Sequence, residues 1–310
     1  MNYKKIISVV MFLFLGIGFF VTNFHDTSSK PTKVSQKPIV LVTTFSIYDI
    51  TKHIAQDSID LVKILPAGVS PHSFEPTPKL MVKIEKSALV IFSGGGLEPW
   101  VDGFHFKNSA LNISKYVQLR HIKSTHKEKE NHHHSGVDPH YWLDIDNMII
   151  ATEVITKKLI EIAPKNKTLY LQNKKNYISM LHQLQKDFSA KLKECHQDTL
   201  VSNHNAFSYI AQKYHFKTAP LSGLSPQAMP SAKKISALMQ RIAKEHITTI
   251  FFESFANEKV IQTIAKDTKV DVDVLHPLGN ITATQEKNNL TYEDIMRENL
   301  SKISKALECR

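Results

Sequence analysis

The chain alternates twice between short, apolar, β-rich runs and segments of helical period, and this alternation constrains the fold more than any other feature. The first alternation predicts strands at Ile39–Thr44, Leu61–Leu65 and Leu89–Ser93, with helices at Ile47–Ala55 and Pro78–Lys86. The second predicts strands at Thr199–Ser202, near Thr218–Leu221, at Ile247–Phe252 and at Val270–Leu275. Strands that alternate with helices favour parallel sheets covered by helices.

A nearly continuous helical period from residue 147 to about 194 separates the two alternations. Pro164 interrupts it, because proline cannot continue a helix, and a long helix of roughly 27 residues follows. We therefore expect an α/β protein of two lobes with parallel-rich sheets flanked by helices, joined by one long rigid helix. The expected bounds are 38–146 for the N-terminal lobe, 147–195 for the linking helices and 196–310 for the C-terminal lobe.

The N-terminus departs from this globular pattern. Lys4 and Lys5 precede an almost wholly apolar run, Ile6–Val21. A basic segment followed by a short apolar one indicates an export signal, whereas a spanning helix needs about 20 apolar residues. We expect a signal sequence over 1–26, a spacer over 27–37 and a folded part outside the cytoplasm, in the periplasm. An uncleaved membrane anchor stays open, because no small-residue cleavage motif follows the apolar run.

Charge and cysteine content narrow the function classes. The net charge of +10 comes from lysines spread along the chain without interleaved aromatic residues, so we expect no nucleic-acid partner. Cys195 and Cys309 are the only cysteines and neither belongs to a CxxC pair, which argues against a thiolate metal site. Because an exported chain keeps its disulfides, we expect these two to pair, with two separate thiols as the alternative.

Four histidines follow predicted strands or lie in connections: His72, His140, His204 and His276. Ligands of open α/β sheets bind outside the carboxyl ends of the strands, so these side chains are placed to converge on a cleft between the lobes. Imidazole nitrogens suit Zn²⁺, whereas Mn²⁺ favours carboxylates. We therefore expect a zinc site with manganese as the second choice, and Asp138 or Asp144 as a partner that orients the His140 ring.

Residues 121–136 form a polar segment rich in His, Lys and Glu. Its composition predicts a mobile loop that binds metal loosely and more weakly than a preorganised cleft. Its histidines are His121, His126, His132, His133 and His134.

Several motifs together resemble the zinc and manganese solute-binding proteins of bacterial ABC importers. They are LPAGVSPHSFEPTPKLM, GGGLEPWV, DPHYWLD, SNHNAFSYIAQKYHF, LSGLSP, FFESFANEKVIQTIA and VLHPLG, in the order typical of that family over residues 38–310. The resemblance implies two α/β lobes, a metal in the cleft between them, and a His-rich loop of the kind that zinc members carry. Its partners would be a metal permease and its cytoplasmic ATPase, and we expect the chain itself to be a monomer.

The resemblance also implies a ligand set. Three family ligands fall on His72, His140 and His204, and histidine at the third position favours zinc over manganese. The fourth family position is usually Asp, but this chain has His276 there. The fourth ligand is therefore His276, Glu253 or water, and we expect Glu253 to support the ligands rather than bind.

Two other functions must be weighed against metal import. Three histidines and a water also describe a hydrolytic zinc enzyme, but the chain has no HExxH or GxSxG motif. A surface adhesin is the second alternative, and no sequence feature marks such a surface. We expect a metal-binding protein of a transport system and not an enzyme.

Overall fold

The first sheet lies in the N-terminal lobe of the computed structural model, which describes residues 37–310 except 105, 107, 122–135, 225–229 and 254–257. Its four parallel strands have the order β2-β1-β3-β4. They are β1 Ile39–Val42, β2 Asp60–Lys63, β3 Leu89–Phe92 and β4 Ser109–Asn112. All of β3 is buried, as expected for a central parallel strand covered on both faces. Strand β4, which buries only Leu111, is absent from the strands predicted from the sequence.

The second sheet lies in the C-terminal lobe and is also parallel throughout, in the order β10-β9-β7-β8. Its strands are β7 Thr199–Ser202, β8 Lys217–Pro220, β9 Thr249–Glu253 and β10 Asp271–Leu275. A short antiparallel pair, β5 Arg120–His121 and β6 Val137–Asp138, stands apart from both sheets. The two-lobe α/β architecture expected from the sequence is confirmed.

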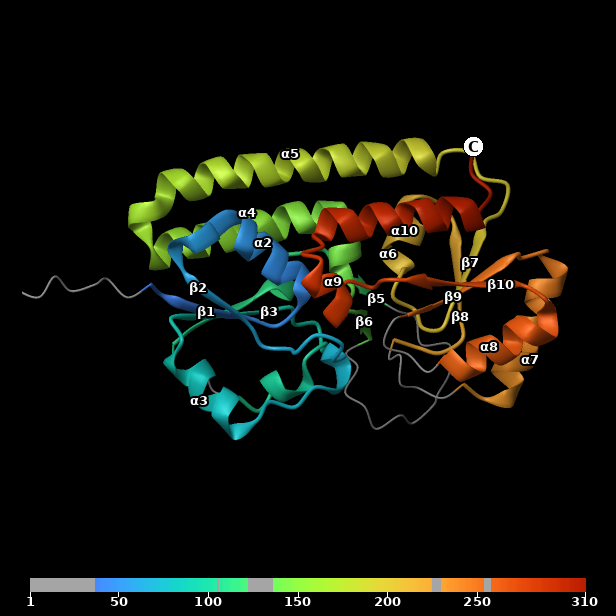
Figure 1. Ribbon diagram of the computed structural model, residues 1–310, viewed down its shortest axis with the longest axis horizontal. Helices are drawn as coiled ribbons and strands as arrows, with labels where there is room; N and C mark the ends of the chain where they lie inside the picture. Colours follow the sequence, from blue (N-terminus) through green and yellow to red (C-terminus); the bar gives the residue numbers. More distant parts are fainter. Residues whose placement is uncertain (1–36, 105, 107, 122–135, 225–229, 254–257) are drawn as a thin grey trace, which may run out of the picture. The chain divides into compact units, whose positions relative to one another are not determined.

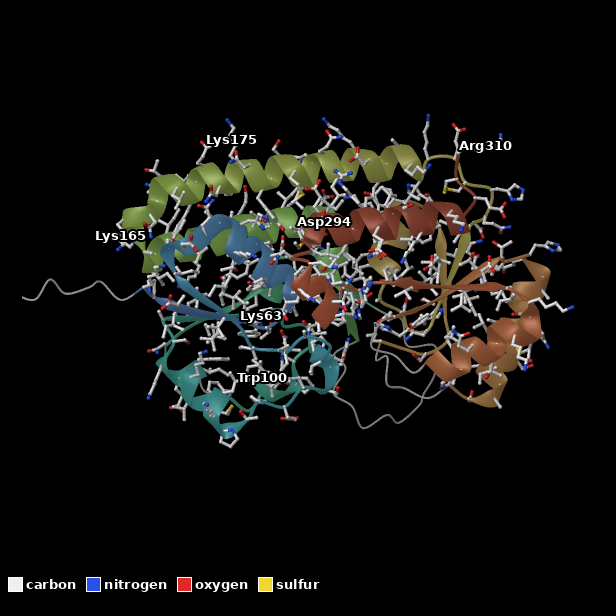
Figure 2. The ribbon with its side chains drawn as sticks, viewed as in Figure 1. Lys63, Trp100, Lys165, Lys175, Asp294 and Arg310 are labelled. Atoms are coloured by element: carbon white, nitrogen blue, oxygen red, sulfur yellow. A yellow bond between two sulfur atoms is a disulfide. The ribbon has the colours of Figure 1, made fainter. Side chains whose placement is uncertain are left out.

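A layer of helices runs along one side of both sheets (Figure 1). It consists of α2 Phe45–Ala55, α4 Ile145–Ile162, α5 Lys167–Lys191 and α10 Tyr292–Ala306. The 25-residue α5 packs on α2 in the N-terminal lobe and on α10 in the C-terminal lobe, so it joins the two lobes. As predicted, a turn that begins at Pro164 separates α4 from α5. Figure 2 shows Lys175 of α5 pointing away from this layer.

Shorter helices cover the remaining faces of the sheets. Helix α3 Pro78–Lys86 lies on the far face of the first sheet, where Ile84 packs with Leu41 and Val90. Helices α7 Ala232–Lys244 and α8 Glu258–Thr268 cover the second sheet in the same way. Two further short helices, α6 Ser208–Lys213 and α9 Ala283–Lys287, follow β7 and β10 along the chain.

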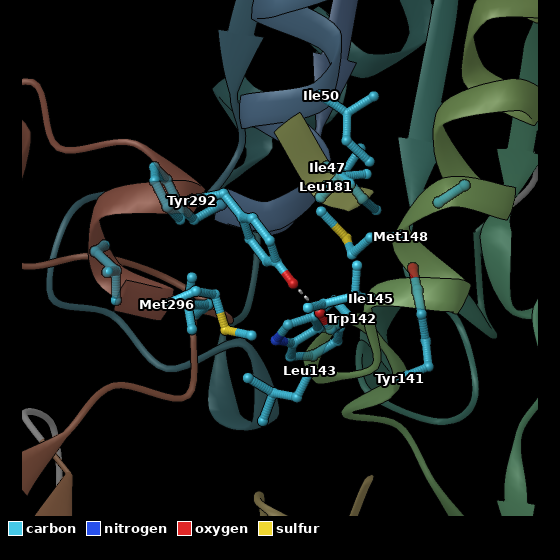
Figure 3. Close-up of a cluster of buried hydrophobic side chains, with 14 of the residues drawn as sticks. Ile47, Ile50, Tyr141, Trp142, Leu143, Ile145, Met148, Leu181, Tyr292 and Met296 are labelled. Atoms are coloured by element: carbon cyan, nitrogen blue, oxygen red, sulfur yellow. Dashed lines mark hydrogen bonds between the residues drawn. The ribbon is translucent and has the colours of Figure 1, made fainter. Parts of the chain in front are cut away.

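The main hydrophobic core draws on both lobes and surrounds Trp142 (Figure 3). Trp142 is fully buried, its Nε1 donates a hydrogen bond to the Pro277 carbonyl, and its own carbonyl accepts one from the Tyr292 hydroxyl at 2.7 Å. Met148 and Leu181 pack in the same cluster. The residues after His140 are thus held by groups that come from the far end of the chain.

Cys195 and Cys309 form a disulfide that ties the end of α5 to the end of α10. Both half-cystines pack against the main core. The pairing expected from the sequence is therefore present in the structure. The expected signal sequence (1–26) and most of the spacer lie outside the described residues. Within the described part of the chain, no helix has the length and apolar character needed to cross a membrane.

Candidate metal centre

His72 comes from a loop of the N-terminal lobe that follows β2. The loop contains a turn in which Val69 N–H donates to the Pro66 carbonyl, and Gly68 has the positive φ of 83° that such a turn requires. A single 3₁₀ turn, Pro71–Ser73, then carries His72. Proline at its first position presets the backbone, so the imidazole is presented from a stiff segment.

His140 follows β6 and is buried, with 2% exposure. Asp138 accepts a hydrogen bond from the backbone N–H of His140 at 3.0 Å, and the same Oδ1 lies 2.8 Å from the ring Nδ1. This Asx-type turn, with Pro139 at its centre, fixes both the backbone and the ring. Because Nδ1 faces the carboxylate, the ring turns Nε2 toward the centre of the site.

His204 follows β7, and Glu253 is the last residue of β9. The register pairs Ser202 with Phe251, so His204, two residues beyond β7, lies near Glu253 at the end of the neighbouring strand. His204 Nδ1 contacts Glu253 Oε1, and both side chains are almost fully buried. Glu253 thus contacts Nδ1 of His204, the ring nitrogen that faces away from the other histidines, as Asp138 contacts Nδ1 of His140.

The three imidazoles meet at their Nε2 atoms. His72 Nε2 lies 3.3 Å from His140 Nε2, and His204 Nε2 lies 3.4 Å from the same atom. One nitrogen of each ring lies within 4.8 Å of the others, and among the described residues this is the one group of three or more possible metal ligands. Zinc binds nitrogen at about 2.0–2.1 Å in a tetrahedral arrangement, which separates two ligand nitrogens by about 3.3–3.4 Å. The spacing therefore fits a tetrahedral zinc ion.

Asp138 is itself held by groups from the C-terminal lobe. Ser208 Oγ donates to its second carboxylate oxygen, and the Tyr209 hydroxyl donates to its backbone carbonyl at 2.8 Å. Burial alone would raise the pKa of Asp138, but the hydrogen bonds from His140 and Ser208 outweigh it and hold the pKa below its usual value. Asp138 is therefore a carboxylate at neutral pH. Asp144, the other expected partner of His140, instead caps α4.

A small cavity opens beside the three histidines. Its lining combines ligand candidates with groups from both lobes: Ser70, Pro71, His72, His140, Trp142, His204, Glu253, Pro277, Gly279 and Asn280. Apart from the histidines and Glu253 the walls are mostly apolar or neutral. The negative charge nearest a bound cation would come from Glu253 and from Asp138, which lies behind His140.

The structure does not bring His276 into this group. Its Nε2 lies 3.0 Å from the Gln285 side-chain nitrogen, and burial lowers the pKa of His276. His276 follows β10, and β9 lies between β10 and β7. Two strand spacings separate β10 from β7, about 10 Å, so the shared sheet edge that the sequence predicted does not make His276 and His204 neighbours.

The His-rich loop lies largely outside the described residues, including His126, His132, His133 and His134. His121 is exposed on β5, opposite Val137. A further acid, Glu98, has no predicted role and is buried near the end of β3. Burial raises the pKa of Glu98, and the carboxylate accepts hydrogen bonds from Thr43 Oγ1 and from backbone N–H groups after β3.

Comparison with known proteins gives consistent matches over most of the chain. The family described as "Zinc-uptake complex component A periplasmic" matches residues 40–306. The high-affinity zinc uptake system protein ZnuA of Bacillus subtilis is 31% identical over 296 residues, which cover 91% of each chain.

Two solved structures are also similar. The Zn(II)-bound ZnuA-like domain of Streptococcus pneumoniae AdcA is 28% identical, with a TM-score of 0.75 over 88% of this chain and 99% of that one. The laminin-binding protein Lmb of Streptococcus agalactiae is described as bifunctional, with adhesin and metal transporting activity. It is 28% identical, with a TM-score of 0.78 over 87% of this chain and 99% of that one.

Proposed function

Because this chain belongs to the family of periplasmic component A proteins of zinc-uptake complexes, we propose that it captures Zn²⁺ outside the cytoplasm and delivers it to an ABC importer. The partners are a metal permease in the membrane and its cytoplasmic ATPase, and the protein acts as a monomer. The location outside the cytoplasm rests on the basic and apolar segments at the N-terminus. The His-rich loop is a weaker, secondary site.

The spacing of the three Nε2 atoms carries the proposal. His72, His140 and His204 come from three separate segments, yet the Nε2 atoms of His72 and His204 each lie at the separation of a tetrahedral zinc site from that of His140. His140 and His204 each have a carboxylate at the outer nitrogen, the usual support of zinc-binding imidazole. The candidate ligands are nitrogen atoms, with few oxygen atoms beside them, and such a ligand set favours zinc over manganese.

We assign the fourth position to water or to the free oxygen of Glu253, and not to His276. Three histidines and a water also occur in zinc hydrolases. Among the described residues that line the cavity Glu253 is the one acid, and its Oε1 contacts His204 Nδ1, which makes it a supporting group. The related proteins named above are uptake and binding proteins, which favours transport.

The test is metal binding by the purified protein. We expect one tightly held zinc per chain by mass spectrometry and a preference for Zn²⁺ over Mn²⁺ in competition. Replacing His204 with Ala removes a ligand and should weaken zinc at least about 100-fold. His182→Ala is the matched control, because His182 is exposed on α5. Equal zinc affinity of the two variants, or preferred binding of Mn²⁺, would refute the proposed site.

A further inference from the structure

The loop that carries His72 is docked on a segment of the C-terminal lobe. This segment, residues 277–281, follows β10 and lines the cavity beside the histidines. The Gly68 N–H donates a hydrogen bond to the Ile281 carbonyl at 2.9 Å, and the Phe45 N–H donates one to the Gly279 carbonyl at 3.0 Å. The position of His72 therefore depends on a contact between parts of the chain that are more than 200 residues apart.

Asn280 is the side chain that makes this contact. Its Nδ2 donates hydrogen bonds to the carbonyls of Pro66, at 2.6 Å, and Val69, at 2.8 Å. Its Oδ1 accepts the N–H of Ile281 at 2.9 Å, which fixes the orientation of the amide. Asn280 is 3% exposed, so its amide is withdrawn from water and its hydrogen bonds to the loop are not readily replaced. Without Asn280 the Pro66 carbonyl keeps only the Val69 N–H, and the Val69 carbonyl loses this donor.

The contact also leaves little room for the His72 loop to shift. A Cβ atom on Gly279 would lie 3.3 Å from Cγ of Pro71 and 3.5 Å from Trp142. Pro71 precedes His72, so the backbone of 277–281 supports the residue before the imidazole. The turn at 66–69 is held by Asn280, and the chain at Pro71 rests on Gly279.

We infer that Asn280 is a positioning residue for metal capture, which holds the His72 loop against the C-terminal lobe so that His72 Nε2 stays within ligand distance. The inference rests on the proposed zinc function. Asn280 acts on zinc through His72 and not as a ligand. Release of these hydrogen bonds frees one of the three histidines while leaving His140 and His204 with their carboxylate partners.

The experiment compares zinc affinity and zinc dissociation rate in the full chain by chelator competition. Asn280→Ala should bind zinc about tenfold more weakly, mainly through faster dissociation, because His72 is no longer held. Asn280→Asp should be weaker than Asn280→Ala, because a carboxylate cannot donate and would face two carbonyl oxygens. If Asn280 acted instead as a ligand or an electrostatic partner of the ion, Asn280→Asp would bind more tightly than the parent.

Asn108→Ala is the matched control. Asn108 Nδ2 also donates to two backbone carbonyls, those of Glu85 and Ser87, but in a part of the N-terminal lobe that does not line the cavity. This variant should keep the parent's zinc affinity. A general loss of stability would lower the melting temperature of the Asn280 variants without altering the dissociation rate measured well below it.

A double-mutant cycle with His72→Ala separates positioning from other effects. In the His72→Ala background, Asn280→Ala should cause no further loss of affinity, and additive losses would overturn the inference. If Asn280→Ala does not fold, Asn280→Ser takes its place in the cycle. A parent protein that binds no zinc refutes the proposed function, whereas a parent that binds zinc with an affinity unchanged by Asn280→Ala refutes only the positioning role.

Discussion

Replacing Asp138 with Asn tests how much of the zinc affinity depends on the buried charge behind His140. The substitution keeps the size of the side chain and an oxygen for His140 Nδ1, but it removes the negative charge. Oδ1 lies 2.8 Å from Nδ1. A zinc ion bound at Nε2 would lie roughly 6–7 Å from this carboxylate. At an effective dielectric constant of about 20, the two charges attract each other by about 5 kcal/mol at that distance.

This attraction is an upper limit on the zinc-binding free energy that Asp138→Asn loses, because the Asn amide and rearranged polar groups replace part of the attraction. Loss of such an outer partner usually weakens metal binding about 10- to 100-fold. We expect Asp138→Asn to lie near the upper end, about 100-fold, because the carboxylate is fully buried. The zinc-free protein should also lose some stability, because the hydrogen bonds from His140 and Ser208 that lower the pKa of Asp138 favour its charged form in the folded state.

The assay is chelator competition at neutral pH, paired with chemical denaturation of the zinc-free protein. Ser208→Ala removes only the hydrogen bond to Oδ2 and leaves the charge, so it should weaken zinc less than tenfold. Asp146→Asn makes the same chemical change at an exposed carboxylate and should have no effect. Zinc affinity of Asp138→Asn within about twofold of the parent would refute the reasoning.

Three further predictions follow from contacts described by the structure. His276→Ala should keep zinc affinity within about threefold of the parent in chelator competition, because its Nε2 lies against Gln285, and a much larger loss would show that His276 binds the metal. Serine at both Cys195 and Cys309 should lower the free energy of unfolding by up to about 4–5 kcal/mol, since the bond closes a separation of 114 residues. As a control, reducing the disulfide of the parent protein should lower its free energy of unfolding by an equal amount. The hydrogen bond to Asp49 raises the pKa of His53, so the stability it contributes is present below about pH 6.5 and is lost as the pH rises through the folded pKa. The stability difference between the parent and His53→Gln should thus be larger at about pH 6 than at about pH 8.5, and a constant difference would contradict the assignment.

Much of the fold was predictable because local patterns determine it. Helix α3 and strand β7 lie at the predicted residues, since a proline after Thr77 starts the helix and the TLVS run is wholly buried. Strand β4 was missed because its SALN sequence resembles a loop, and its place at the sheet edge depends on pairing with β3. That pairing is a tertiary effect which local pattern does not report.

The site was predictable only in part, for a geometric reason. The rule that ligands bind beyond the carboxyl ends of strands predicted that His204 and His276 would lie at one edge of the second sheet. It says nothing of strand order, and the order β10-β9-β7 sets His276 two strands away from His204. Asn280 and Ser208 had no signal at all, because each acts through contacts with residues far away in the chain.

The three histidines and Asn280 also determine when during folding the site can exist. His72 and His140 are 68 residues apart, His140 and His204 are 64 apart, and Asn280 reaches back 214 residues to Pro66. Contacts between such distant residues require large loops to close, which delays them relative to local structure. A chain whose last hundred residues are still unfolded lacks this clamp on His72. If Asn280 holds His72 as proposed, the complete zinc site forms only when the C-terminal lobe has folded, and tight zinc binding would mark completed folding.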